Sequence, residues 1–246
     1  MAEISKTTDQ ALTVLLELSE NGPMTPAELS RSLDMNRTVV HRLLATLHRR
    51  GFVTRLDNGY VSGAVLLRMA EGVQPELRAC ARPILTELAA SVGETIVMHI
   101  PDGDEAVVLD QIVARHQVLR VEHHIGSRHP LARGASGRAL LAFLPEPKIT
   151  RVVAAADAPG ALQEQLDAVR TLGYAMSHDE LQEGVHGIAV PVLVRPGEAT
   201  ASIAVLAPTM RASTLPQHVN PLRQAAARIA ATLSGASDGG RNGVVV

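Results

Sequence analysis

Two capped helices follow each other closely between residues 25 and 50, and this spacing constrains the fold more than any other feature of the chain. Thr25-Pro26-Ala27-Glu28 forms a capping box, in which Thr25 accepts a backbone N–H near Glu28 and Pro26 occupies the first helical position. The first helix is therefore predicted from Pro26 to Leu33. Asp34-Met35-Asn36 then forms a turn, and Asn36 caps a helix from Arg37 to Arg50 that ends at Gly51.

The second of these helices has two chemically different faces. Its apolar residues follow helical spacing and are expected to face a core: Val40, Leu43, Leu44 and Leu47. After it, Phe52–Arg55 and Tyr60–Val61 flank Asp57-Asn58-Gly59, which predicts a β-hairpin with Asn-Gly in its turn. Helix, turn, helix and hairpin are the layout of a winged helix-turn-helix, a module that reads DNA.

Positive charge is concentrated in this segment. Six arginines stand between Arg31 and Arg55 against the single Asp34, in a chain whose formal net charge is −2. Arginine supplies phosphate contacts and bidentate contacts to guanine. The residues predicted to contact DNA are Thr25, Arg31, Asn36, Arg37, Thr38, His41, Arg42 and Arg55. Two alternatives remain open: a packing unit with a solvated basic face, and a scaffold that binds proteins without salt-dependent affinity for DNA.

The flanking segments complete the expected N-terminal organisation. A helix from Thr8 to Asn21, with Leu12, Leu15, Leu16 and Ser19 at helical spacing, is expected to cover the other two. Ser62 is expected to cap a short helix that ends near Gly72, and Pro75 starts a longer one reaching Val92. The expected domains are a winged helix-turn-helix over residues 1–61, a helical linker over 62–74, a C-terminal domain over 75–234 and a disordered tail over 235–246.

Beyond Gly93 the pattern changes to strands and helices, which predicts an α+β domain with a mixed sheet flanked by helices. The expected strands are Thr95–Ile100, Ala106–Val113, Val118–Glu122, Ile188–Val194 and Ser202–Ala207. The expected helices are Ser136–Leu144, Glu146–Ala155, Leu162–Leu172 and His218–Leu233.

Three segments together resemble the IclR family of bacterial transcriptional regulators. They are Met35–Leu47 followed by Gly51-Phe52-Val53, Gly126–Ala142, and Asp179–Val192. The resemblance covers about residues 7 to 234. It implies a GAF-like C-terminal domain that binds a small effector and a homodimer, or a dimer of dimers, that binds a pseudo-palindromic operator on double-stranded DNA. The sign of the coupling between effector and DNA stays open.

The predicted effector site lies at the start of the helix near Gly134. Backbone N–H groups of Arg133–Gly137 would seat a carboxylate there, and the resemblance brings in the segment at Asp179 and the strands near Gly187 and Ala204. Family members commonly carry cysteine at Gly187, and some carry serines at Ala204 and Leu206, so we expect a wider, more apolar cavity that suits an aromatic or branched organic acid. The predicted effector-binding residues are Leu119, Val121, Arg133, Gly134, Ala135, Ser136, Gly137, Asp179, Gly187, Ile188, Ala204 and Leu206.

Catalytic and metal chemistry are weaker interpretations of the same domain. His116, His123, His124 and His129 lie close in sequence but lack zinc-type spacing. His178, Asp179 and Glu180 have no accompanying nucleophile motif, which favours a hydrogen-bonded loop. We therefore expect neither an enzyme nor a cofactor. The alternative is a hydrolase or metal-dependent enzyme domain fused to a nucleic-acid-binding module.

Composition excludes other classes of protein. The chain is 46% hydrophobic with only 2% aromatic residues, so aliphatic side chains must fill its cores. It lacks an apolar run of about 18 residues, and Met1–Gln10 lacks the layout of a secretion signal, so a cytoplasmic protein is expected. The lone Cys80 is expected to be a small buried hydrophobe rather than a redox sensor.

Overall fold

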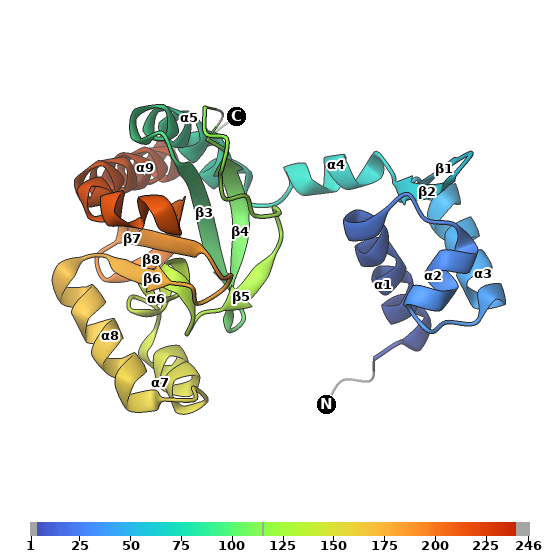
Figure 1. Ribbon diagram of the computed structural model, residues 1–246, viewed down its shortest axis with the longest axis horizontal. Helices are drawn as coiled ribbons and strands as arrows, with labels where there is room; N and C mark the ends of the chain where they lie inside the picture. Colours follow the sequence, from blue (N-terminus) through green and yellow to red (C-terminus); the bar gives the residue numbers. More distant parts are fainter. Residues whose placement is uncertain (1–3, 115, 240–246) are drawn as a thin grey trace, which may run out of the picture. The chain divides into compact units, whose positions relative to one another are not determined.

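The chain divides into two compact units, Met1–Pro75 and Glu76–Val246 (Figure 1). The computed structural model describes residues 4–114 and 116–239. The first unit contains a helical bundle with a β-hairpin, and the second contains a six-stranded sheet covered by helices. The predicted α+β architecture is confirmed. Within the described ranges, no helix combines the length and the apolar character needed to cross a membrane.

The first unit has the predicted helix-turn-helix order. Its elements are α1 (Lys6–Asn21), α2 (Pro26–Ser32), α3 (Arg37–Arg49), β1 (Val53–Leu56), β2 (Gly59–Ser62) and α4 (Val65–Glu71). The Thr25 hydroxyl accepts from the Glu28 N–H at 3.3 Å, and the Glu28 carboxylate accepts from the Thr25 N–H at 2.7 Å. The Asn36 side chain accepts from the Thr38 N–H at 2.8 Å. Both predicted caps are therefore confirmed.

The inward face of α1 differs from the expected one. Val14 and Leu18 are buried, whereas Leu12 and Leu16 are 55% and 65% exposed. The prediction that Leu12 and Leu16 cover the other helices is wrong. The apolar residues from Ala11 to Leu18 form a wide stripe on this helix, so their spacing alone allowed two orientations.

The hairpin turn lies one residue earlier than expected. Leu56 pairs with Gly59, so Asp57 and Asn58 form the turn and Gly59 opens β2. Gly59 has φ +142°, and a Cβ there would lie 2.6 Å from the backbone C and O atoms of Met24. Glycine is required because β2 packs directly against the segment before α2.

The start of α4 also differs from the expectation. Ser62 pairs with Val53 in the hairpin, and α4 follows Ala64, which makes no side-chain capping bond. Because Ser62 belongs to β2, the prediction that it caps the next helix is wrong. The helix α4 has no buried residues.

The second unit is built on one sheet with the strand order β5-β4-β3-β8-β7-β6. Its elements are α5 (Pro75–Val92), β3 (Thr95–Asp102), β4 (Glu105–Ile112), β5 (Arg128–Pro130), α6 (Gly134–Leu141), α7 (Glu146–Ala154), α8 (Pro159–Leu172), β6 (Ala175–His178), β7 (Val185–Arg195), β8 (Glu198–Pro208), the 3-10 helix η1 (Thr209–His218) and α9 (Val219–Gly239). Every pairing in this sheet is antiparallel, so the expected mixture of strand directions is not found.

Helices cover both faces of the sheet (Figure 1). On one face, Ile96 and Met98 of β3 join the core formed with α5 and α9. On the other, Val97 joins the core formed with α6, α7 and α8. Because side chains alternate along a strand, His99 follows Val97 onto the α6 side of the sheet. This places a histidine on the face that carries the cavity described below.

One further prediction about the second unit fails, and another differs from the structure only where the chain is described. Val118–Glu122 is not a strand, and the three-residue β5 pairs with β4 instead. The expected tail begins at residue 235, but α9 continues to Gly239, and residues 240–246 lie outside the described part of the chain. The Gly-Ser composition of this region misled the prediction because alanines precede it and continue the helix.

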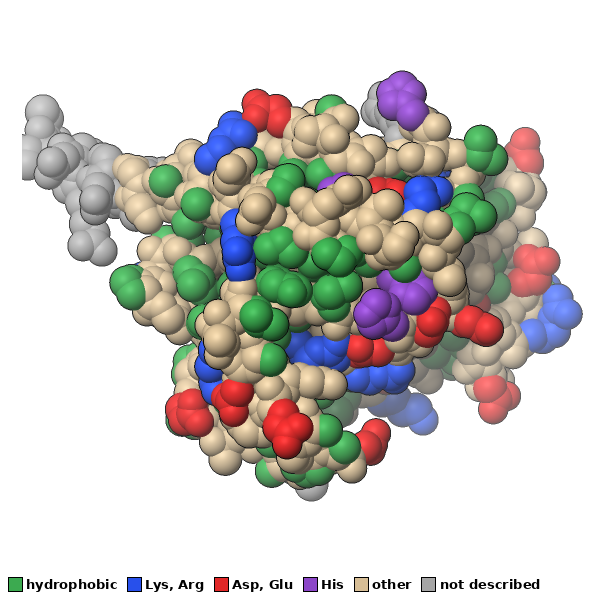
Figure 2. Space-filling view, turned by 60° about the vertical axis from the view of Figure 1, so that its left-hand side comes forward, with side chains coloured by type: hydrophobic (Ala, Val, Ile, Leu, Met, Phe, Trp, Pro, Cys, Tyr) green, Lys and Arg blue, Asp and Glu red, His purple; other side chains and the backbone are tan. Residues whose placement is uncertain are grey.

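Charged side chains of the second unit neutralise one another locally. The ion pairs found among the described residues all lie between Arg82 and Arg228. Figure 2 shows one face of the molecule, on which Lys and Arg side chains lie beside Asp and Glu side chains next to a central group of hydrophobic ones. The local excess of positive charge lies in the segment from Arg31 to Arg55 of the first unit, in which six arginines stand against one aspartate.

Candidate functional site

The outer face of α3 exposes basic side chains. Arg37, Thr38, His41 and Arg42 are exposed, while Val40, Leu43, Leu44 and Leu47 on the other side are buried. Among the described residues, neither Arg37 nor Arg42 forms an ion pair. Their guanidinium groups are thus available to an external anion such as a phosphate.

The other predicted DNA contacts border this helix in the sequence but differ in availability. Arg31 and Arg55 are exposed, and the Arg31 Nε donates to the Ala27 carbonyl at 3.4 Å. Asn36 is exposed while its side chain caps α3. Thr25 is half-buried, and its hydroxyl is used in the capping box. Thr25 therefore has a structural task that competes with any contact to DNA.

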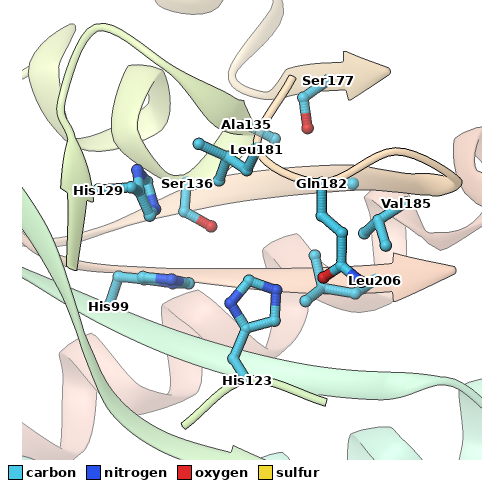
Figure 3. Close-up of a pocket in the computed structure, with 11 residues that line it drawn as sticks. His99, His123, His129, Ala135, Ser136, Ser177, Leu181, Gln182, Val185 and Leu206 are labelled. Carbon is cyan, nitrogen blue, oxygen red and sulfur yellow. The ribbon is translucent and has the colours of Figure 1, made fainter. Parts of the chain in front are cut away.

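A small cavity lies beside the loop 179–184 in the second unit (Figure 3). Its volume of about 20 Å³ holds roughly one water molecule, far less than the several hundred Å³ of a typical ligand pocket. It is lined by His99, His123, His129, Ala135, Ser136, Ser177, Leu181, Gln182, Val185, Gly187 and Leu206. Any organic ligand larger than water requires Leu181 or Gln182, which are both exposed, to move outward.

Three histidines converge on this cavity from three segments (Figure 3). The His99 ring centroid lies 5.2 Å from that of His129 and 6.5 Å from that of His123. His99 comes from β3 and His129 from β5. The backbone of His123 is held by the Gln111 side chain, whose Oε1 accepts from the His123 N–H at 3.0 Å and whose Nε2 donates to the His123 carbonyl.

The rings of His99 and His129 are buried with unused hydrogen-bonding capacity. His99 is 1% exposed, and neither of its ring nitrogens has a partner among the described residues. The Nε2 of His129 is likewise buried and unpartnered. Burial lowers the pKa of all three histidines, and their mutual repulsion lowers that of His99 and His123 further. Neutral imidazoles therefore face the cavity near pH 7.

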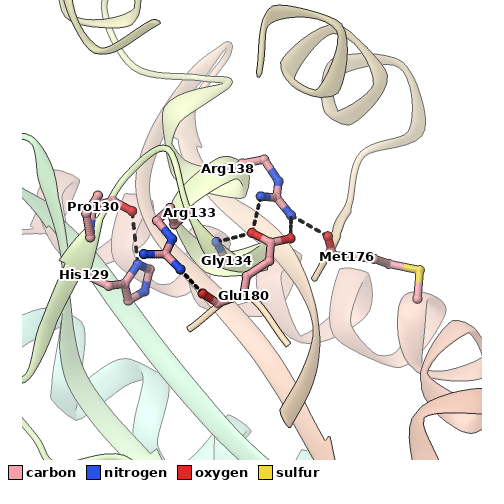
Figure 4. Close-up of polar contacts among 7 residues, drawn as sticks. All are labelled: His129, Pro130, Arg133, Gly134, Arg138, Met176 and Glu180. Atoms are coloured by element: carbon pink, nitrogen blue, oxygen red, sulfur yellow. Dashed lines mark hydrogen bonds and ion pairs between the residues drawn. The ribbon is translucent and has the colours of Figure 1, made fainter. Parts of the chain in front are cut away.

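The anion seat predicted at the start of α6 is already filled by the chain itself (Figure 4). The Gly134 N–H donates to Glu180 Oε2 at 2.9 Å, and the Arg138 guanidinium binds both carboxylate oxygens of Glu180 at 2.6 Å. Burial would raise the pKa of Glu180, but the bonds from Arg138 and the Gly134 N–H outweigh it and lower that pKa. The seat recognises a carboxylate as expected, but this carboxylate is Glu180.

The loop 179–184 borders the cavity and is closed by Asp179. The Asp179 Oδ1 accepts from the Gly184 N–H at 2.7 Å, and the Asp179 N–H donates to the Val185 carbonyl at 3.0 Å. Asp179 adopts φ +54°, in the left-handed region. Asp179 thus shapes the loop and does not line the cavity. This agrees with the interpretation of the segment as a hydrogen-bonded loop.

Four of the predicted effector residues line the cavity: Ala135, Ser136, Gly187 and Leu206. Leu119 is 52% exposed, and Ile188 faces the core on the opposite side of the sheet. Val121 and Ala204 are buried in the adjoining core, and a Cβ on Gly137 would lie 2.7 Å from the Leu131 carbonyl oxygen. Arg133 donates to the Glu180 carbonyl, and Gly134 binds the Glu180 carboxylate. None of these other residues forms the wall of the cavity.

The cavity is small, and its wall combines three histidine rings with apolar side chains. A Cβ on Gly187 would lie 3.2 Å from Cδ2 of Leu206 and 3.1 Å from Oγ of Ser177, so these side chains fill the space where family members carry cysteine. The described side chains therefore leave a small space at Gly187, and the prediction of a wider, more apolar cavity than in other family members stays a prediction. The other seven lining residues were not predicted to be here: His99, His123, His129, Ser177, Leu181, Gln182 and Val185. Signals were available for the histidines, because His99 stands within the apolar strand run Thr95–Ile100 and His123 and His129 stand in a histidine-rich segment.

The described part of the chain contains no cluster of side chains suited to a metal ion. Among these residues, no group of three or more His, Cys, Asp and Glu side chains is placed to hold a metal ion. His178 and His186 bind each other through Nδ1 at 2.8 Å, and the His186 Nε2 lies 3.0 Å from the Thr209 hydroxyl. These contacts join β6, β7 and η1 and give the histidine pair a structural role.

Two family profiles match the chain. Residues 73–231 match the profile described as "Bacterial transcriptional regulator IclR C-terminal", and residues 5–60 match that of the MarR family. The HTH-type transcriptional regulator BhcR of Paracoccus denitrificans is 32% identical over 225 residues, which cover 83% of this chain and 78% of the relative. This relative is named as a transcriptional regulator and not as an enzyme.

Solved structures share the fold. The IclR regulator of Alicyclobacillus acidocaldarius is 25% identical with a TM-score of 0.80, covering 95% of this chain and 100% of that one. An IclR homologue from Microbacterium hydrocarbonoxydans, solved in complex with 4-hydroxybenzoate, is 21% identical with a TM-score of 0.79, covering 94% of this chain and 100% of that one. With one family profile matching well over half of its length, the chain belongs to the IclR family of bacterial transcriptional regulators.

Proposed function

We propose that this regulator binds a pseudo-palindromic operator through α3 and that a small organic acid, bound in the cavity of the second unit, changes the operator affinity. The outer face of α3 supports the first part of this proposal, which is DNA binding. It presents arginines without acidic partners among the described residues, on a helix that Asn36 caps. A helix of this kind enters the major groove with its N-terminal side chains against the base edges.

The regulator would act as a homodimer or a dimer of dimers. One recognition helix reads too few bases for useful specificity, whereas a two-fold pair reads two half-sites. The first unit also leaves apolar side chains exposed on two helices, Leu12 and Leu16 on α1 and Leu67 and Met69 on α4. Burying them against a second copy would remove them from water.

The cavity supports the effector half of the proposal. It combines apolar walls from Ala135, Val185 and Leu206 with the unpartnered ring nitrogens of His99 and His129. Buried polar groups without partners cost free energy that a ligand can recover. We further propose that the acid carries an aromatic ring, because the homologue from M. hydrocarbonoxydans was solved in complex with 4-hydroxybenzoate.

Fluorescence anisotropy on the DNA upstream of the regulator's own gene tests the first half. We expect tight binding, with an affinity that falls steeply as salt rises. Arg37→Ala and Arg42→Ala should weaken binding and lower the salt slope by about 1 for each phosphate contact removed. The control is Arg195→Ala, an arginine of the second unit that is 79% exposed and lies 3.9 Å from Glu198.

Thermal-shift and calorimetric titrations with aromatic and aliphatic monocarboxylates test the second half. At least one acid should stabilise the second unit, and Ser136→Val or His99→Leu should weaken its binding. Absence of binding by every acid at every pH would refute the effector half and leave the DNA-binding half intact.

A further inference from the structure

The protonation state of one ring nitrogen in the cavity is fixed by its neighbour. His129 Nδ1 lies 3.2 Å from the Pro130 carbonyl oxygen. A carbonyl oxygen only accepts, so Nδ1 carries the hydrogen, and in the neutral ring Nε2 keeps a bare lone pair. That nitrogen is buried and has no partner among the described residues. The cavity therefore contains an acceptor that needs a donor.

His99 supplies the complementary group. It is 1% exposed, and both of its ring nitrogens lack partners within the described ranges. A neutral imidazole has one N–H donor and one acceptor, so His99 has an N–H to offer. With ring centroids 5.2 Å apart, His99 and His129 together present a donor and an acceptor to one small ligand.

An ionised carboxylate matches only half of this pattern. Its oxygens accept from His99, but they meet the lone pair of His129 Nε2 and not a donor. We propose that the cavity binds a small carboxylic acid together with one proton, held between a carboxyl oxygen and His129 Nε2, so that acid binding strengthens as the pH falls. The inference rests on the proposed function, in which this cavity is the effector site.

The charges around His129 set the direction of this coupling. His99 from β3, His123 from the 121–125 segment, Glu105 from β4 and Arg133 before α6 face the ring. Burial lowers the pKa of His129, while the carbonyls of Pro130 and Arg133 and the charge of Glu105 oppose that effect and Arg133 adds to it. The free ring is neutral near pH 7, and a bound anion favours its protonation. The proton comes from solvent and stays in the complex.

Calorimetry of the full-length protein in phosphate and in Tris buffer measures this proton directly, because the two buffers differ in heat of ionisation. We expect benzoate to bind with uptake of about one proton and its Kd to rise about tenfold per pH unit above neutrality. Benzamide carries its own N–H donor and should bind without proton uptake. Pyruvate and pyruvamide form the same pair for small aliphatic acids.

Variants separate this inference from the proposed function. His129→Gln should abolish both proton uptake and the pH dependence of the benzoate Kd, whereas His124→Gln, at an exposed neighbour outside the cavity wall, should leave both unchanged. Nitrogen NMR of the free protein should show His129 protonated on Nδ1. Acid binding without proton uptake, or a hydrogen on His129 Nε2, overturns the inference alone; no binding of any acid overturns the proposed effector site as well.

Discussion

Removing the Glu180 carboxylate should destabilise the second unit because it leaves the Arg138 charge buried. The Arg138 side chain is 6% exposed and binds three acceptors, both carboxylate oxygens of Glu180 and the Met176 carbonyl, each at 2.6 Å. In Glu180→Gln the amide keeps one acceptor but turns an NH₂ group toward the guanidinium. Arg138 then retains its positive charge without a countercharge.

The magnitude follows from the burial of the two partners. Breaking a fully buried ion pair by removing one partner costs about 3–5 kcal/mol. Glu180 is 29% exposed, so water can approach the vacated position, and we expect about 2–3 kcal/mol for Glu180→Gln. Arg138→Met should cost less, about 1–2 kcal/mol, since the remaining carboxylate is partly hydrated and keeps the Gly134 N–H. The double variant should cost less than the sum of the two.

Urea unfolding followed by tyrosine fluorescence measures this loss in the second unit alone. The chain has no tryptophan and two tyrosines, Tyr60 in the first unit and Tyr174 in the second. In a Tyr60→Phe background, only Tyr174 contributes to the tyrosine fluorescence, so the signal follows unfolding of the second unit. Glu183→Gln, on an exposed residue of the same loop, should change the free energy of unfolding by less than about 0.5 kcal/mol. If Glu180→Gln behaved like Glu183→Gln, the role assigned to this ion pair would be refuted.

Three further predictions concern other parts of the molecule. Burial lowers the pKa of His99 below its ordinary value of 6.5, so below about pH 6.5 the unfolded chain binds more protons than the folded one. The stability of the second unit should therefore fall as the pH drops below about 6.5 and stay constant above it. Tm measured from pH 5 to 8 should show this fall, and the fall should be smaller in His99→Gln. Gly59→Ala should destabilise the first unit by about 2 kcal/mol or more in urea, because its Cβ would meet the Met24 backbone at a positive φ. Leu16→Glu should lower self-association in sedimentation velocity, and an unchanged oligomer would contradict the assigned dimer surface.

Local signals predicted the first unit well because each one acts within a few residues. The capping box at Thr25, the cap at Asn36 and the glycine at Gly51 define the ends of α2 and α3 without reference to the rest of the fold. The face of α1 was not predictable in this way. Apolar residues form a wide stripe along that helix, and only packing against α3 and β2 selects Val14 and Leu18 from it.

The cavity was harder to predict because its wall comes from segments far apart in the chain. Family resemblance located Ala135, Ser136 and the strand positions, but it could not show that Glu180 occupies the N-terminus of α6. That contact joins residues 46 apart and depends on the loop closed by Asp179. The sequence indicates that the backbone N–H of Gly134 can bind an anion, but it does not indicate which anion occupies that position.

The surroundings of His99 were also not predictable from the sequence. A histidine in an apolar strand is compatible with a satisfied core residue, and only the surroundings reveal that its two nitrogens have no partner among the described residues. The size of the space at Gly187 likewise depends on side chains that come from other strands. Replacing cysteine by glycine at position 187 does not open a space when Leu206 and Ser177 fill it.

If acid bound in the second unit and operator bound by the first are energetically coupled, one reciprocal titration shows it. Operator affinity is measured by anisotropy with and without saturating acid, and acid affinity is measured by calorimetry with and without saturating operator. We expect the acid to change operator affinity by at least about fivefold and the operator to change acid affinity by the same factor. Operator affinities that are equal in the presence and absence of a bound acid would contradict this expectation.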